Sequence, residues 1–206
     1  KRPAPADRRP VLTASAARYY VEAMAVLPII IAPDPRLKRR AEAVAKVDAE
    51  TRRLMDDLFE TMHAANGIGL AAPQVGVLKR VIVIEIPPPK NAPDEEPRIF
   101  RMANPEIVWA ADETELRNEG CLSLPEHFAE VRRPTRIRVR YLDRDNEIRE
   151  TEAEGLLAVC IQHEMDHLDG VLFVDHVSAL KRGMILRKLT KTKRQSEPAT
   201  EPAAVE

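Results

Sequence analysis

The residues best able to do chemistry form one short stretch, His163-Glu164-Met165-Asp166-His167. Helical side chains four residues apart share a face, so the two imidazoles can bind one metal ion. Glu164 follows the first histidine and can reach a water on that ion without itself being a ligand. The spacing therefore predicts a metal site that activates water.

The helix that must carry this stretch is apolar on several faces. The residues directly before it include Leu156, Leu157, Val159, Cys160 and Ile161. Such a pattern is typical of a buried helix and argues against ordinary polar residues on an exposed helix face. Buried histidine and glutamate side chains cost free energy unless each has a partner, which favours a bound metal.

Two histidines rarely hold a metal alone, so a third ligand is expected. The long metalloprotease motif needs a histidine where this chain has Phe173. The thermolysin-like pattern needs a glutamate well downstream, yet the only acids between His167 and Gln195 are Asp169 and Asp175. Both protease patterns therefore fail at the third ligand.

Cys121, within Glu119-Gly120-Cys121-Leu122-Ser123, is the favoured third ligand. A Cys/His/His set leaves one coordination position open for water, which is the arrangement of catalytic sites. Cys160 is the competitor. Its place three residues before His163 on the same helix suits core packing or pocket lining better.

Apolar periodicity predicts the elements that position these residues. Helices are expected from Asp48, a good N-cap, to Asn66, over residues 154–168, and after Ser178. Short runs rich in β-branched residues predict strands over residues 80–86, 99–103 and 136–142, and the prolines of residues 87–97 predict a surface loop. Strands in the middle with helices at both ends indicate an α+β fold.

Composition bounds the class of protein. The chain has 206 residues and a net charge of −1, which suits one domain and gives no reason to expect a general nucleic-acid or specific DNA partner. Aromatic residues are only 4%, too few for a stacking platform. The longest apolar run, residues 25–32, contains Pro28 and is too short to cross a bilayer. Two cysteines make no disulfide framework, so the cytoplasm is the expected compartment.

The two ends differ from the middle of the chain. Residues 1–23 are rich in Pro, Ala and Arg. A transit peptide is one interpretation, but three early prolines interrupt any amphipathic helix and favour a disordered or upstream-translated extension, with Met24 as the start of the folded part. Residues 195–206 are acidic and are also expected to be disordered. The folded, catalytic part is thus expected to span residues 24–194.

Three segments together resemble the signature motifs of the bacterial peptide deformylase family, in the family's order. They are Gly67-Ile68-Gly69-Leu70-Ala71-Ala72-Pro73-Gln74, Glu119-Gly120-Cys121-Leu122-Ser123 and Gln162-His163-Glu164-Met165-Asp166-His167. The resemblance covers residues 24–194 and leaves out both ends. It implies an α+β fold in which antiparallel sheets surround the metal-binding helix.

The resemblance implies a metal-dependent amidase that removes the N-formyl group from the initiator methionine of new proteins, releasing formate. It also implies that Cys121, His163 and His167 bind the metal and that Glu164 moves the protons. Gln74 and the backbone N–H of Leu122 would stabilise the oxyanion, although Gln74 also suits a simple turn hydrogen bond. An amidase of another N-acyl specificity and an inactive peptide-binding module are the alternatives.

A peptide-binding groove is expected beside the metal. Glycines 67 and 69 allow a peptide to approach as an added strand, although glycines equally mark the end of a helix. Val159 and Cys160 lie one turn before the ligands and suit an apolar pocket for methionine, with plain core packing as the alternative. The expected substrate-binding residues are Gly67, Ile68, Gly69, Gly120, Val159 and Cys160.

The metal and the partners follow from the same resemblance. It implies Fe(II) as the native ion, with nickel, cobalt or zinc able to occupy the site, and ligand softness does not choose between iron and zinc. The implied partners are N-formylmethionyl nascent peptides. Residues 181–194 carry seven basic residues and no acid. They suit a solvated helix face or a contact with ribosomal RNA.

Overall fold

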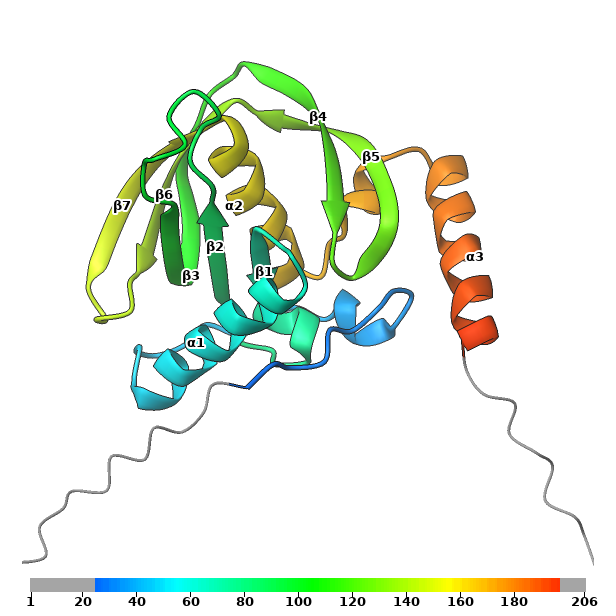
Figure 1. Ribbon diagram of the computed structural model, residues 1–206, viewed down its shortest axis with the longest axis horizontal. Helices are drawn as coiled ribbons and strands as arrows, with labels where there is room; N and C mark the ends of the chain where they lie inside the picture. The colour runs from blue at the N-terminus through cyan, green and yellow to red at the C-terminus, as the bar shows by residue number, and fades with distance from the viewer. Residues whose placement is uncertain (1–24, 197–206) are drawn as a thin grey trace, which may run out of the picture.

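The computed structural model describes residues 25–196 (Figure 1). Its α-helices are α1 (Ala49–Ala64), α2 (Gly155–Leu168) and α3 (Ala179–Ser196), with short 3-10 helices η1 (Pro35–Lys38), η2 (Ala72–Val75) and η3 (Phe173–His176). Its strands are β1 (Gly69–Ala71), β2 (Val81–Ile86), β3 (Arg98–Ala110), β4 (Thr114–Cys121), β5 (Leu124–Pro134), β6 (Arg136–Leu142) and β7 (Ile148–Glu154).

The strands form two antiparallel sheets. Five strands make one sheet in the order β1-β2-β3-β6-β7, and β4 and β5 make a separate two-stranded sheet. Helix α2 lies between the five-stranded sheet and the β4–β5 pair (Figure 1). The α+β fold with a central helix is therefore confirmed.

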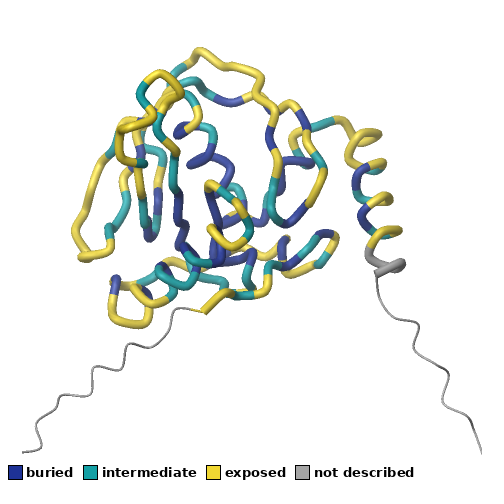
Figure 2. The backbone as a smooth tube through the Cα atoms, in the orientation of Figure 1, coloured by how far each residue is buried: buried dark blue, intermediate teal, exposed yellow. Residues whose placement is uncertain are grey.

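Helix α2 is buried because both sheets pack against it. Leu157, Ala158 and Ile161 form one core with Ile82 and Val139 of the large sheet. Figure 2 shows buried residues gathered around α2 and exposed residues at the far ends of the strands. Leu156, expected within the buried part of the helix, is instead 46% exposed. It lies in the first turn, where the helix reaches the surface.

A second core holds the C-terminal elements in place. Ile185 and Leu189 of α3 pack with Val131 of β5 and with Phe173 and Val174 of η3. Helix α3 thereby stands against the outer side of the β4–β5 pair (Figure 1). It ends at Ser196, two residues beyond the predicted end of the folded part.

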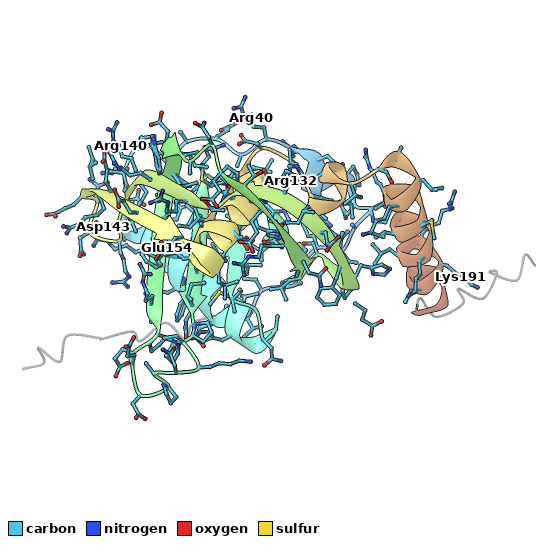
Figure 3. The ribbon with its side chains drawn as sticks, turned by 90° about the horizontal axis from the view of Figure 1, so that it is seen from above. Arg40, Arg132, Arg140, Asp143, Glu154 and Lys191 are labelled. Carbon is cyan, nitrogen blue, oxygen red and sulfur yellow. The ribbon has the colours of Figure 1, made fainter. Side chains whose placement is uncertain are left out.

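Ion pairs connect β6 to the edge strand β7. On β6, Ile137 and Val139 are buried while Arg138 and Arg140 face outward and pair with Glu152 and Glu150 of β7, at 3.2 and 2.8 Å. Figure 3 shows Arg140 at the surface of this sheet. Such cross-strand pairs each contribute about 0.2–1 kcal/mol and help to set the register.

Most predicted elements are confirmed, and the differences have a physical cause. Helix α1 begins after Asp48, whose side chain accepts a hydrogen bond from the Thr51 amide. The predicted strand over residues 99–103 extends to Ala110. Strands β1, β4, β5 and β7 were not predicted, because β1 has three residues and the others are rich in exposed charged side chains.

The two ends of the chain lie largely outside the described residues. The proposed extension over residues 1–23 and the tail beyond Ser196 are not among them. Within residues 25–196, no helix has the length and apolar character needed to cross a membrane.

Candidate active site

A Cys/His/His cluster lies where β4 meets the middle of α2. Cys121 is the last residue of β4, and His163 and His167 project from successive turns of α2. One ligand atom from each lies within 4.8 Å of the other two, and Cys121 Sγ is 3.2 Å from His167 Nε2. A tetrahedral ion with bonds of about 2.0–2.3 Å needs ligand atoms roughly 3.5 Å apart, so the cluster fits one metal.

The orientation of His163 is set by a buried carboxylate. Its Nδ1 donates to Glu119 Oε2 at 2.9 Å, which leaves Nε2 directed at the cluster. Metal-binding histidines commonly have such a carboxylate partner, which fixes the tautomer and raises the basicity of the ring. His167 is almost fully buried, and its Nδ1 has no hydrogen-bond partner within the described residues.

Glu119 stays ionised because Arg133 holds it. The guanidinium donates from Nε and Nη2 to the two carboxylate oxygens, at 2.8 and 2.9 Å. Burial alone would raise the pKa of Glu119, but the hydrogen bonds from Arg133 and His163 outweigh it and lower the pKa to about 2. Glu119 therefore remains a hydrogen-bond acceptor for His163 at any working pH.

Glu164 is a buried acid beside the cluster. Its side chain reaches the cavity, and its Oε2 has no hydrogen-bond partner among residues 25–196. Burial raises the pKa of the Glu164 carboxyl to about 7. A carboxyl group with a pKa near the working pH can both accept and return a proton, which a general acid–base must do.

Gln74 makes the turn hydrogen bond and faces the cluster as well. Its Oε1 accepts from the Ala71 amide at 2.8 Å, while its Nε2 donates to Ser123 Oγ at 3.1 Å and lies 3.6 Å from Cys121 Sγ. The expected turn hydrogen bond and the expected oxyanion donor are compatible, because the first uses Gln74 Oε1 and the second would use Nε2. Leu122, which follows the cysteine, also lines the cavity.

A cavity of about 430 Å³ opens onto this site. It brings together all the expected substrate-binding residues, Gly67, Ile68, Gly69, Gly120, Val159 and Cys160. Its lining also includes Leu156 and Phe128, which are 46% and 61% exposed and form an apolar rim. The size and the mixed lining suit a short peptide with an apolar side chain.

Cys160 is separate from the metal cluster. Its Sγ lies 3.6 Å from the Ile68 carbonyl oxygen, and burial raises the pKa of its thiol well above the usual value. Among residues 25–196 the ligand cluster contains Cys121 and not Cys160. Cys160 belongs to the core around α2 and also lines the cavity, so both core packing and pocket lining describe its position.

Comparison with known proteins assigns the family. Residues 26–183 match the polypeptide deformylase family. A peptide deformylase of Phenylobacterium zucineum is 54% identical over 168 residues, covering 82% of this chain and 97% of that protein. The chain belongs to the polypeptide deformylase family. It is a metallohydrolase that removes the N-formyl group from nascent peptides.

Solved structures agree with the deformylase assignment. The peptide deformylase of Ehrlichia chaffeensis in complex with actinonin has a TM-score of 0.78 and 44% identity, covering 83% of this chain and 99% of that one. A Met-Ala-Ser-bound class I type b peptide deformylase of Acinetobacter baumannii has a TM-score of 0.69 and 38% identity, covering 75% and 99%. The deformylase family implies a divalent metal, and the cluster described above is a possible site for it.

Several residues around this deformylase site were not predicted. Glu119 and Asp166 stand within the motifs, but nothing in their spacing indicates a role, and Arg133 lies outside the motifs. Arg133 has no signal in the sequence, because its neighbours are Arg132 and Pro134 and the segment resembles an exposed basic strand. Phe128 could have been found only from the pairing of β5 with β4, which places its ring over Gly120.

Because Gly69 has no side chain, the Glu164 carboxylate can lie directly against the backbone at this position. A Cβ atom at this position would lie 2.3 Å from Glu164 Oε1 and 2.8 Å from Cys160 Sγ. We expect Gly69→Ala to displace the carboxylate and to lower kcat/KM about 100-fold, the cost of misplacing a catalytic group by roughly 1 Å. Steady-state formate release measures this effect.

Gly183→Ala is the matched control. Apart from the backbone of α3 itself and the chain neighbours, no atom of the described residues lies within 4 Å of the added Cβ, so activity should stay at the wild-type level. Equal activity of the two variants would show that the position of Glu164 is not sensitive to Gly69.

Proposed function

We propose that this deformylase acts through Cys121, His163 and His167 as metal ligands and Glu164 as general base and acid. The observation that carries the assignment is Glu164 Oε2, which lies buried at the cavity wall beside the ligand cluster and has no hydrogen-bond partner among residues 25–196. Leaving a buried polar atom unpaired costs about 1–3 kcal/mol, so this oxygen is well placed to bind a water or a substrate group in the cavity.

The metal and Glu164 have separate tasks. When bound, the metal supplies a Lewis acid, which can lower the pKa of water from 15.7 to roughly 7. Glu164 accepts a proton from the water that attacks the formyl carbon. It then delivers that proton to the departing amine nitrogen, so that formate and a free amino terminus are released. Burial raises the pKa of the Glu164 carboxyl, which favours its holding the proton between the two transfers.

The oxyanion is stabilised by uncharged donors. Gln74 Nε2 faces the cluster because Oε1 is held by the Ala71 amide. The backbone N–H of Leu122, directly after the cysteine ligand, is the second donor. These groups are fixed before substrate arrives, so little reorganisation is needed as the negative charge develops.

A Gln74→Glu variant tests this donor. Glutamate keeps an acceptor for the Ala71 amide but removes the N–H bonds, and we expect kcat to fall about 10²–10³-fold, as for other lost oxyanion donors. Metal content should stay at one ion per chain. A Ser123→Ala variant, which removes the hydroxyl that Gln74 contacts, should cost much less. Comparable kcat values for wild type and Gln74→Glu would rule out the role.

The substrate peptide lies along the edge of the large sheet. Within residues 25–196, strand β1 lies at the edge of the large sheet beside β2, and Gly67, Ile68 and Gly69 line the cavity next to it. The methionine side chain enters among Val159, Cys160 and Gly120. The relative from Acinetobacter baumannii binds Met-Ala-Ser, a short peptide that begins with methionine.

We propose Fe(II) as the native ion, with nickel, cobalt or zinc able to replace it. A thiolate–imidazole set accepts any of these metals. An iron–thiolate site is sensitive to oxygen, with Cys121 as the vulnerable ligand. Metal analysis after anaerobic purification, paired with turnover, checks the assignment. The two cysteines favour the reducing cytoplasm as the compartment.

Helix α3 is the proposed contact with the ribosome. Lys181, Arg182, Arg187, Lys188 and Lys191 are all exposed, while the apolar side of the helix packs on the core. Figure 3 shows Lys191 at the end of the molecule away from the five-stranded sheet. Such a basic face can bind RNA phosphates.

Charge reversal on α3 tests the contact. Changing Arg187, Lys188 and Lys191 to glutamate should abolish salt-sensitive co-sedimentation with ribosomes, because each lost phosphate contact weakens binding. Reversal is preferable to truncation, since Ile185 and Leu189 belong to the core. The control changes three exposed cations elsewhere, Lys46, Lys90 and Arg132, to glutamate. Equal co-sedimentation of the two triple variants would refute the contact.

A further inference from the structure

The turn η3 touches the metal site at two points. The Phe173 ring stacks on His163, with 6.4 Å between the ring centroids and 24° between the planes. At the other end of the turn, His176 Nε2 donates to Asp166 Oδ2 at 2.7 Å. Phe173 stands where a longer metalloprotease motif would have its third ligand, and here it supports a ligand instead.

A continuous set of hydrogen bonds joins His176 to the proposed ligand His163. The same Asp166 oxygen that accepts from His176 also accepts from Arg133 Nη1, at 2.7 Å. Arg133 donates its other two nitrogens to Glu119, and Glu119 accepts from His163 Nδ1. Five side chains from β4, β5, α2 and η3 thus form one network.

The side chains of the network become less exposed from the surface inward. The side chains of His176 and Asp166 are 35% and 23% exposed, whereas those of Arg133 and Glu119 are 7% and 3% exposed. A buried guanidinium needs all its partners, since an unpaired charged donor is strongly unfavourable. If Asp166 turned toward solvent, Arg133 Nη1 would lose its acceptor. The Arg133 guanidinium, which donates to both Glu119 oxygens, could then move.

His176 is what restrains Asp166 on its outer side. The turn that carries it is itself fixed, because the neighbouring Asp175 accepts hydrogen bonds from Lys38 and from the Leu172 amide and pairs with Arg182 of α3. These contacts hold the turn so that His176 stays next to Asp166. The position of Asp166 depends on this contact as well as on Arg133.

We propose that His176 is a positioning residue for the metal ligand His163, acting through Asp166, Arg133 and Glu119. The proposal rests on the ligand set given under Proposed function. The expected consequence is a weaker metal site without His176, because the orientation and basicity of a ligating histidine depend on its hydrogen-bonded carboxylate.

The test measures metal affinity directly, by competition between the protein and a chelator for Co²⁺. We expect His176→Phe to weaken Co²⁺ binding about tenfold, the lower end of the effect of removing an outer partner of a ligand. The visible absorption of bound Co²⁺ should also change, since it reports ligand geometry. His176→Gln, which keeps a donor, should restore much of the affinity.

His63 provides the matched control. It pairs with Glu85 at 2.6 Å, and its side chain is 43% exposed, so the pair resembles that of His176 and Asp166 but does not reach a ligand. His63→Phe should leave Co²⁺ affinity and absorption unchanged. A purely structural role for His176 would instead lower the unfolding temperature of the metal-free protein without changing the Co²⁺ spectrum, and that result would overturn the proposal.

A second variant keeps the test decisive if His176→Phe folds poorly. Asp166→Asn weakens the same link from the inner side and should also lower the affinity for Co²⁺, whereas unchanged affinity would contradict the network. Failure of the ligand set is recognised separately. If His163→Ala still binds one Co²⁺ with wild-type affinity, the assignment of the ligands is wrong, and the role of His176 falls with it.

Discussion

Replacing Glu164 with alanine is expected to abolish formate release while leaving the metal bound. Glu164 is the only acid of the His-Glu-x-x-His stretch that lines the cavity, and its side chain lies outside the ligand cluster. Loss of a general acid–base typically lowers the rate about 10²–10⁴-fold, and Glu164 is the group proposed for both proton transfers. Single-turnover formate release with metal analysis measures the two effects independently.

Two further variants sharpen the Glu164 prediction. Glu164→Gln keeps the shape of the side chain and should be almost as inactive, because an amide cannot accept the proton. Glu130→Gln changes an exposed acid of β5 and should retain wild-type turnover. Substantial activity in Glu164→Ala with one metal per chain would mean that another group moves the protons.

Replacing Cys121 with serine is expected to remove both metal and activity. The thiolate is one of the three proposed ligands, and Cys121 Sγ lies 3.2 Å from His167 Nε2. Loss of a ligand should weaken metal binding by more than the roughly 10–100-fold that loss of an outer hydrogen-bond partner costs. Metal content after gel filtration and turnover of the same sample check the prediction.

Cys160→Ala is the matched control for Cys121→Ser. Cys160 is the other cysteine of the chain, and it lies outside the ligand cluster while lining the same cavity. This variant should keep one metal per chain, although its KM can change because the wall of the pocket changes. Loss of metal in Cys160→Ala with retention in Cys121→Ser would reverse the ligand assignment.

The parts of the fold with strong periodicity were predictable, and the parts governed by pairing were not. Helices α1 and α2 bury apolar faces, so their positions follow from the sequence. Strand β4 is mostly exposed and carries alternating charges and polar groups. Its identity as a strand depends on hydrogen bonds to β5, which lies beyond a turn and has no local signal.

The same division holds within the site. His163 and His167 were predictable because helical spacing places them on one face. The hydrogen-bonded residues that orient His163 were not predictable. Arg133 is 30 residues from His163 in the chain and meets Glu119 only through the β4–β5 pairing. Leu156 was expected inside the core and proved to be part of the cavity rim, since periodicity alone does not show where a buried helix reaches the surface.

The most direct test of the account is a comparison of N-formyl and N-acetyl peptides with the metal content known. Formyl-Met-Ala-Ser should yield one formate per peptide, and acetyl-Met-Ala-Ser should yield almost no acetate, with one metal ion per active chain. Faster release of acetate would favour an amidase of another specificity. Binding of both peptides without release of either acid, by fully metallated protein, would show a peptide-binding module and contradict the account.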